Sequence, residues 1–573
     1  MFKKTEIVDS KLLLFLVVCL ATIICIIWRY NQFSSIGPFT DHAFYMQWIK
    51  RMVYADHFFP LQEMNKNWLQ TLMVDSNSFC NIFFRQIYSS HPLIFTSIST
   101  LLFVIFSELI GASIQNQILI SIIIATLSIS ILSSFPFIAF REQKERDFLF
   151  KSFLCTILTF LLLSLSSFLN IFSALGVHNF GIFFLIISSL INIYWLKVGS
   201  FQAPKKITTL MIVGQVFAIY SHYTNVFLIP TSTFISILIS LEKPISWRLK
   251  TSFNYFFITI LLFLPILVIL TFFFFGPVKV PFGNTFSAVA SEVMISPTEI
   301  FLKITERIYF WFSFHSSVFS ILGLSGSLLG LIHLAFRHDV LLPITITFCH
   351  FLSSVIIPAF YLQKTGAYIL PFLCLGLSWL LTLILYELKK EFFPKKSLKL
   401  RSIIQIIALI TVLLFHLSKE IPRLINPEKT IWAQVLYIRS IWDPIVDVIN
   451  KLLVNQEQFL GWNYPITNTV FSLIDQKKKT IAWQRPLSTL DAEHKKKRLK
   501  EYITTRGLKW TQHQDSYLLV PGSIKYYVLK KILHNILGPN GFNLRQPFKV
   551  IRIKDWQHPK QTQSFHLYMI STK

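Results

Sequence analysis

The sequence predicts an α-helical polytopic membrane protein that ends in a small extramembrane α/β or α+β domain. Of its 573 residues, 53% are hydrophobic and 14% are charged, whereas about a quarter of the residues in a typical soluble domain are charged. Apolar runs of membrane-spanning length, separated by basic connections, recur over residues 1–418. The rest of the chain is less apolar and holds turn-forming segments between short β-like runs.

The composition excludes several classes of function. Of the six cysteines, all except Cys80 fall inside apolar runs, so the sequence supports neither a disulfide framework nor a CxxC metal pattern. The formal net charge is +26, and much of it lies in loops beside apolar segments. That placement suits anionic lipid head groups and topology signals, so we expect membrane lipid as a partner and no nucleic acid.

The apolar segments decide the topology, and one of them is ambiguous. The candidate spans are 12–28, 93–110, 118–140, 153–169, 179–196, 207–221, 224–241, 252–275, 317–336, 340–359, 367–387 and 402–417. If 93–110 does not cross and the N-terminus lies inside, the basic residues of the short connections collect inside, and Lys364 is the one left outside. The positive-inside rule therefore favours eleven spans, with 12–28 retained because no small-residue cleavage site follows it.

This topology gives each connection a side of the membrane. The segment 93–110 lies at the outer surface or re-enters it, within a first external loop of residues 29–117. A second external loop covers 276–316, and a basic C-terminal domain of residues 419–573 also lies outside. We expect the inner membrane of a cell envelope, with a cytoplasmic N-terminus and a periplasmic C-terminal domain.

The C-terminal domain has its own pattern. A helix-like stretch near 430–453 precedes three β-like runs, "SYLLV", "FKVIRI" and "SFHLYMI". The basic tract "EHKKKRLKE" at 493–501 is interpreted as a solvated or lipid-facing helix surface.

The stretch "FTDHAFYMQWIKRM" at 39–52 falls in the first external loop. Phe44, Trp48 and Met52 recur at helical spacing, which predicts an interfacial helix with Lys50 and Arg51 facing away, toward lipid phosphates. Asp41 falls in its first turn. It either caps the helix and complements its dipole, or acts chemically on a substrate.

Other polar residues collect at the same predicted outer face. They are His91, His178, Asn179, His222, Tyr223, Asn225, Tyr361, Lys364 and Tyr368. A carboxylate among such groups can act as general base on a hydroxyl, while cationic groups stabilise a departing lipid phosphate. The histidines show neither HxxxH nor HExxH spacing, so a metal site is only weakly indicated.

The pattern resembles the C-type membrane glycosyltransferases, the GT-C superfamily of the aminoarabinose transferases and protein O-mannosyltransferases (family 39/83-like). The resemblance is carried by "TDHAFYMQWIKRM", "HPLIFTSISTLLFVIFSELIG", "FREQKERDF", "YSHYTNVFLIP" and "KTGAYILPFLCL", and it covers about residues 1–418 in layout. It implies the GT-C fold and a polyprenyl-phosphate sugar donor.

The resemblance also implies roles for individual residues. Asp41 matches the catalytic carboxylate, His91 the position near the donor, and His222 and Lys364 the positions near the lipid phosphate. The full expected set adds His42, His178, Asn179, Tyr223 and Tyr368 for substrate binding, and Lys50, Arg51 and Arg307 for the lipid phosphate. Two departures, His42 in place of a second acid and the His178–Asn179 pair, leave open both the donor sugar and a magnesium or manganese ion.

The leading hypothesis is therefore an inverting glycosyltransferase that passes a sugar to a glycan, lipid or protein acceptor, with Asp41 as general base. A multi-span transporter or flippase is the first alternative, although transporters usually hold their polar groups near the middle of the membrane. A catalytically inactive GT-C-like scaffold is the second, because His42 replaces the usual second acid.

Overall fold

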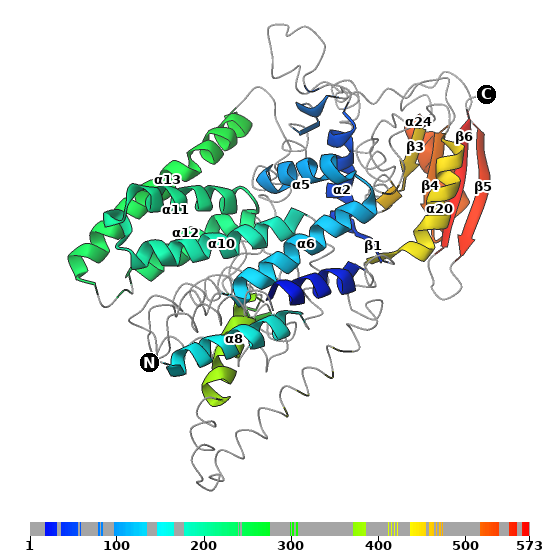
Figure 1. Cartoon of the computed structure of the whole chain (residues 1–573). Coiled ribbons are helices and arrows are strands. Elements are labelled where there is room, and N and C mark those ends of the chain that lie inside the picture. Colours follow the sequence, from blue (N-terminus) through cyan, green and yellow to red (C-terminus); the bar gives the residue numbers. More distant parts are fainter. Residues whose placement is uncertain are drawn as a thin grey trace. The chain divides into compact units, whose positions relative to one another are not determined.

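We describe the fold from a computed structural model of the whole chain. The structure describes residues 18–30, 36–55, 97–134, 146–164, 177–238, 243–275, 371–385, 436–453, 458–462, 516–537, 549–557 and 564–571, with a few shorter pieces. These residues are mostly helical, with a small sheet near the C-terminus (Figure 1).

The predicted apolar segments that fall within the described residues form helices. They are Val18–Tyr30, α5 (Ser97–Ile110), α6 (Ile114–Ser133), α8 (Arg146–Ser164), α10 (Val177–Lys197), α11 (Lys205–Ile219), α12 (Tyr223–Leu238), α13 (Ile245–Phe275) and Pro371–Leu385. The segments predicted at 317–336 and 340–359 lie outside the described residues, as does most of 402–417. By length and composition, two helices of the described residues could cross a membrane, Ile114–Ser133 and His178–Leu196.

Contact clustering divides the chain into two compact units. One comprises Met1–Asn31, Tyr88–Leu102 and Leu119–Thr430, and the other comprises Gln32–Ile87, Phe103–Ile118 and Ile431–Lys573. The first unit contains the helical bundle, and the second combines the start of the predicted external loop with the C-terminal domain.

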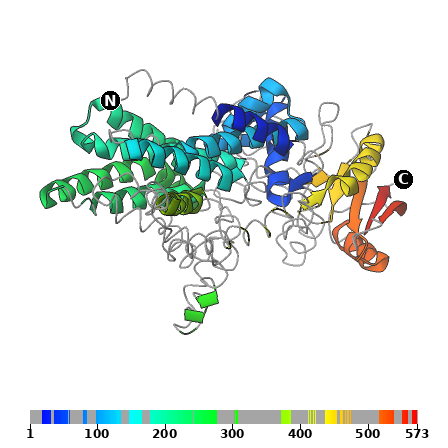
Figure 2. The same ribbon diagram turned by 60° about the horizontal axis from the view of Figure 1, so that its bottom comes forward.

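Helices α10, α11, α12 and α13 form a bundle in which each helix packs beside the next, as both views show (Figures 1 and 2). Short connections join them, so consecutive helices run antiparallel. At one end a cluster around Trp195, Met211 and Tyr255 fixes the packing. At the other end Ile219, Val226 and Leu262 form a second cluster.

The bundle buries polar side chains and exposes apolar ones. Gln215 of α11 donates hydrogen bonds to the Tyr255 hydroxyl at 2.8 Å and to Asn192 Oδ1 at 3.4 Å. Asn192 in turn donates to Thr233 Oγ1 at 2.9 Å. Large apolar side chains of α13, such as Phe253, are exposed. Interhelical amide and hydroxyl bonds with an apolar exterior are typical of helices packed in lipid.

The C-terminal domain is a four-stranded sheet with one helix on each face. The strand order is β3-β4-β6-β5, with β3 parallel to β4 and the other neighbours antiparallel. The strands are β3 (Gln458–Gly461), β4 (Ser516–Pro521), β5 (Lys549–Gln557) and β6 (Ser564–Ser571), and the helices are α20 (Arg439–Leu452) and α24 (Tyr526–Leu537).

Alternation along the strands builds two cores. Tyr517 and Leu519 of β4 face α20 in one hydrophobic cluster. Leu518 and Val520 face α24 in the other, as the two-residue period of a strand requires. The predicted helix near 430–453 and the three predicted β-runs are thus confirmed as α20, β4, β5 and β6. Strand β3 and helix α24 were not predicted.

A second, two-stranded sheet was also not predicted. Strand β1 (Ile36–Phe39) pairs antiparallel with β2 (Leu436–Ile438), so that Ile36 lies opposite Ile438 and Phe39 opposite Leu436. It joins the start of the predicted first external loop to the C-terminal domain.

Candidate functional site

The structure brings two of the predicted site histidines together at one end of the bundle. His178 lies in the first turn of α10, and His222 directly precedes α12. Their ring centroids are 4.7 Å apart with an edge-to-face angle of 67°. With 7% and 1% of their surfaces exposed, the two imidazoles pack against neighbouring helices.

Two asparagines fix the helix ends around this histidine pair. Asn179 donates through Nδ2 to the carbonyl of Ser121 in α6 at 3.2 Å. Asn225 donates through Nδ2 to the carbonyls of Gly181 and Ala218, at 2.9 Å each. Because each amide binds backbone of another helix, the starts of α10 and α12 and the end of α11 are held together, beside the first half of α6.

The first turn of α5 docks on the turn that carries His222. The amide of Ile98 donates to the carbonyl of Tyr220 at 3.1 Å, and the Ser99 hydroxyl donates to the carbonyl of Ser221 at 2.8 Å. The segment predicted to follow His91 therefore begins beside His222. His91 itself lies outside the described residues.

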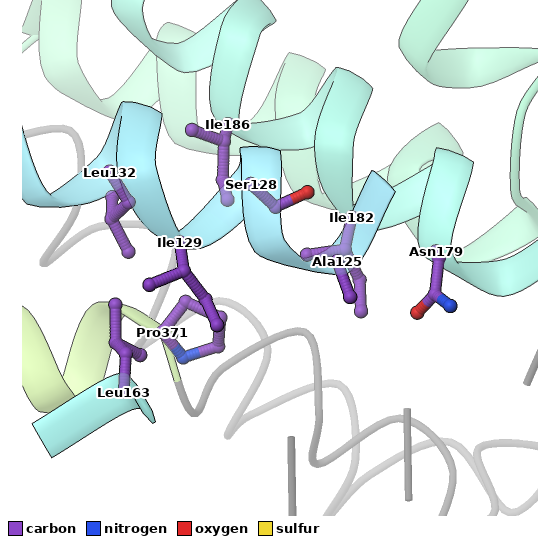
Figure 3. Close-up of a pocket in the computed structure, with 9 residues that line it drawn as sticks. All are labelled: Ala125, Ser128, Ile129, Leu132, Leu163, Asn179, Ile182, Ile186 and Pro371. Carbon is purple, nitrogen blue, oxygen red and sulfur yellow. The ribbon is translucent and has the colours of Figure 1, made fainter. Parts of the chain in front are cut away.

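Asn179 also borders a small cavity between α6 and α10 (Figure 3). The side chains that line it, among them Ala125, Ile129 and Ile182, are largely apolar. Its volume is about 10 Å³, which suffices for about one water molecule. Within the described residues the Oδ1 of Asn179 has no hydrogen-bond partner. The cavity is too small for a sugar or a lipid phosphate.

The predicted amphipathic helix of the first external loop is present as α2 (Thr40–Val53). Its backbone places Asp41 and His42 in the first turn; their side chains lie outside what the structure describes. Of the predicted apolar stripe, Trp48 and Met52 are buried. The helix, the burial of Trp48 and Met52 and the position of Asp41 in the first turn are thus confirmed, while the side chain of Phe44 lies outside what the structure describes.

The prediction that Lys50 faces away from the packed surface is wrong. Lys50 is only 6% exposed. The reason is Met46, fully buried and one helical turn before Lys50, which shows that this side of α2 also packs. Arg51 does not project freely either, because its guanidinium lies 5.1 Å from the ring centroid of Trp48 in a cation–π arrangement. Their binding to lipid phosphate stays a prediction.

The other predicted site residues are not brought into this geometry. The backbone of Tyr223 begins α12, and its side chain lies outside what the structure describes. Lys364, Tyr368 and Arg307 lie outside the described residues altogether. Within the described ranges there is no group of three or more His, Cys, Asp or Glu side chains able to hold a metal ion.

No pattern in the sequence indicates the charged cluster that lies on the C-terminal sheet. Asp555 of β5 lies opposite His566 of β6 in the ladder. Its Oδ1 accepts hydrogen bonds from His566 Nδ1 and Arg552 Nε, at 2.7 Å each. The bond to Asp555 raises the pKa of Arg552. Burial acts to raise the pKa of Asp555, but the bonds from Arg552 and His566 outweigh it and lower that pKa. Only the strand register reveals the cluster.

Comparison of the chain with models of known protein families and with curated protein sequences finds no match.

Proposed function

We propose that the protein is a membrane glycosyltransferase that takes a sugar from a polyprenyl-phosphate donor at the periplasmic face. The acceptor is a glycan, lipid or protein hydroxyl. The observation that carries the proposal is the meeting of His178, Asn179 and His222 beside the first turn of α5. All three are polar residues at predicted outer ends of apolar segments.

The proposed topology is supported by the two ends of the bundle. The polar cluster lies where α11 ends and where α10 and α12 begin. At the opposite end, where α10 and α12 end and α11 and α13 begin, the chain carries basic residues: Lys197, Lys205, Lys206, Lys243, Arg248 and Lys250. One basic end and one polar, uncharged end fit the positive-inside rule with the cluster outside.

Helix α5 supports the proposal that segment 93–110 does not cross the membrane. Its exposed face holds Ile105 and Leu109, and its buried face holds Ser99 and Ser107. A helix with an apolar exposed face and hydroxyl side chains on its buried face suits a segment that lies at the lipid surface or re-enters it.

The pairing of β1 with β2 supports the same topology. Two hydrogen-bonded strands must lie on one side of a membrane, so an even number of crossings separates residues 39 and 436. The proposed spans between them are even in number when 93–110 stays on one face, and odd when it crosses.

In the proposed mechanism the acceptor hydroxyl attacks the anomeric carbon of the donor in line. The Asp41 carboxylate takes the hydroxyl proton, the bond from anomeric carbon to phosphate oxygen breaks with its electron pair, and the configuration inverts. Cationic side chains stabilise the departing lipid phosphate. A magnesium or manganese ion stays a prediction.

The test replaces Asp41 by Asn and follows radiolabelled polyprenyl-phosphate sugars in membranes. Loss of the base should lower transfer by about 10²- to 10⁴-fold while expression and insertion stay normal. Asp447→Asn, which changes an exposed carboxylate of α20, is the matched control. Full activity of the Asp41→Asn variant would overturn this mechanism.

One observation favours the transporter as the second candidate. The bonded set of Asn192, Gln215, Thr233 and Tyr255 lies inside the bundle, away from the helix ends. These groups are uncharged, however, and bond to one another across helices, as structural contacts in membranes do. Uptake of a lipid-linked sugar by vesicles containing the Asp41→Asn variant would favour transport. Unchanged function of that variant in cells, without transfer or uptake, would favour the inactive scaffold.

A further inference from the structure

The two-stranded sheet connects the predicted first external loop with the C-terminal domain, two regions that the sequence predicts to be separate modules. Strand β1 ends at Phe39 and α2 begins at Thr40; strand β2 ends at Ile438 and α20 begins at Arg439. In both places the helix follows the strand with no residue between them. Asp41 is therefore two residues from a strand that pairs directly with the C-terminal domain.

Helix α20, which directly follows β2, is anchored in a hydrophobic core. Trp442, Ile445 and Ile449 of α20 are buried in the cluster that covers one face of the four-stranded sheet. The ring of Trp442 lies 5.0 Å from that of Phe565 in β6, centroid to centroid. Because protein interiors are close-packed, α20 cannot shift along the sheet without creating cavities.

Helix α2, which directly follows β1, is anchored as well. Helix α2 buries Met46, Ile49 and Met52 almost completely. A two-stranded sheet alone is marginal in water, and pairing strands from distant parts of the chain costs loop-closure entropy. The ladder therefore depends on the packing of α2 and α20 at its two ends.

We propose that the C-terminal domain is a positioning element for Asp41, acting through the β1–β2 ladder. The role rests on the proposed glycosyl transfer, in which Asp41 is the base. Proton abstraction requires the carboxylate to lie within hydrogen-bond reach of the acceptor hydroxyl. A displacement of about 1 Å can lower the rate of such a step by about 10²-fold. The domain acts through Asp41 and is not itself catalytic.

The first experiment tests the ladder without any substrate. Ile36→Cys and Ile438→Cys are combined in the full chain, and a specific protease site is inserted between residues 141 and 145, before the start of α8. Directly opposed strand residues have Cα atoms about 4.5–5.5 Å apart, which suits a disulfide. After oxidation and cleavage the halves should stay linked until reduced. Ile36→Cys with Ile551→Cys is the control, since Ile551 pairs with Met569 instead. Failure to cross-link in folded protein would overturn the ladder and the proposal.

The second experiment tests the positioning. Gly-Ser-Gly is inserted between Ile438 and Arg439, which loosens the junction of β2 with α20 and leaves both elements intact. With radiolabelled polyprenyl-phosphate hexoses and pentoses, kcat should fall about 10- to 100-fold while KM for the donor changes little. The same insertion between β5 and β6 is the control.

The outcomes are distinguishable. Disulfide formation in the insertion variant shows that the ladder persists. A lower kcat is then due to the loosened junction of β2 with α20 and not to unfolding. An unchanged kcat with the ladder intact would overturn the positioning role and leave the glycosyltransferase standing. If the unaltered protein transfers no sugar from either donor class, the proposed function fails and the positioning role with it. The disulfide still decides whether the two regions pair.

Discussion

The helical bundle and the C-terminal domain both bury apolar clusters, but the bundle in addition buries amide side chains and exposes large apolar ones. Inside the bundle lie polar residues such as Asn192 and Gln215, while Phe253 of α13 is 72% exposed. In the C-terminal domain the buried set is apolar, with Trp442 and Phe459 almost fully covered. Exposure of large rings such as Phe253 is unfavourable in water, whereas lipid tails are as apolar as the side chains themselves.

The hydroxyl groups show how the bundle tolerates its polar interior. Thr126 and Ser128 of α6 and Ser189 of α10 each donate to a carbonyl four residues earlier in their own helix. Such bonds leave no hydroxyl proton unsatisfied in an apolar medium. The difference between the regions is what the proposed topology requires, with the bundle in lipid and the C-terminal domain in water.

The largest expected effect comes from the core of the C-terminal domain. Trp442→Ala removes a buried ring that packs on Phe565 and should destabilise the domain by about 3–5 kcal/mol. Protease resistance of the C-terminal region during thermal unfolding measures the loss. Ile551→Ala, on an exposed position of β5, is the control and should change stability by less than about 0.5 kcal/mol. Equal effects would remove the distinction between the core and the surface of this domain.

The second prediction tests the exterior of the bundle. Phe253→Asp places a charge on an exposed position of α13. In water such a change is nearly neutral, but within lipid it is unfavourable, by at most about 2.5–3.5 kcal/mol, the cost at the centre of a span. The fraction of full-length protein inserted in membranes measures the cost, and Ile551→Asp on the C-terminal sheet is the matched control. Normal insertion of the Phe253→Asp variant would contradict a lipid-facing surface.

The sequence predicted elements that local patterns specify. The apolar segments, the helix from Thr40 and the strands near Tyr517, Ile551 and Leu567 all follow from periodicity and appear as predicted. The β1–β2 ladder could not be predicted, because nothing in "IGPF" or "LYI" specifies which distant strand each one pairs with. Helix α24 was missed, although Leu529 and Leu533 lie one helical turn apart.

The sequence predicted which residues belong to the candidate site, but not which of them lie close together. The sequence placed His178 and His222 at one predicted face, and the structure brings their rings into contact, which the sequence did not predict. It misplaced Lys50, because a helix wheel assumes one packed face while Met46 shows that a neighbouring face is buried too. The Asp555–His566 contact depends on the register of two strands, which sequence patterns leave undetermined.

The third prediction concerns the polar interior of the bundle. Gln215→Leu and Tyr255→Phe each remove one partner of a hydrogen bond of 2.8 Å. Such bonds between membrane helices contribute about 0.6 kcal/mol on average and at most about 1.7 kcal/mol. Denaturation of the two single variants and the double variant in detergent measures the coupling. A coupling of zero would show that this bond does not stabilise the bundle.

The smallest expected effect is the pH response of the charged cluster on the C-terminal sheet. The folded domain holds the pKa of Asp555 below its usual value, so the folded state binds fewer protons at this site than the unfolded state. The stabilisation is fully present above the unfolded pKa of about 3.9, and it is lost as the pH falls through the lower, folded pKa. Because the Asp555 side chain is 55% exposed, solvent screens the interaction and the change is small.

The measurement compares thermal melting of the C-terminal domain, within the full chain, at about pH 5 and about pH 2.5. The unaltered protein should lose more stability over this interval than Asp555→Asn, which cannot gain the proton. Asp447→Asn, on the exposed face of α20, should behave like the unaltered protein. If Asp555→Asn lost stability just as steeply, protonation of other carboxylates would account for the acid response. The cluster would then be a surface contact without a measurable part in the stability of the domain.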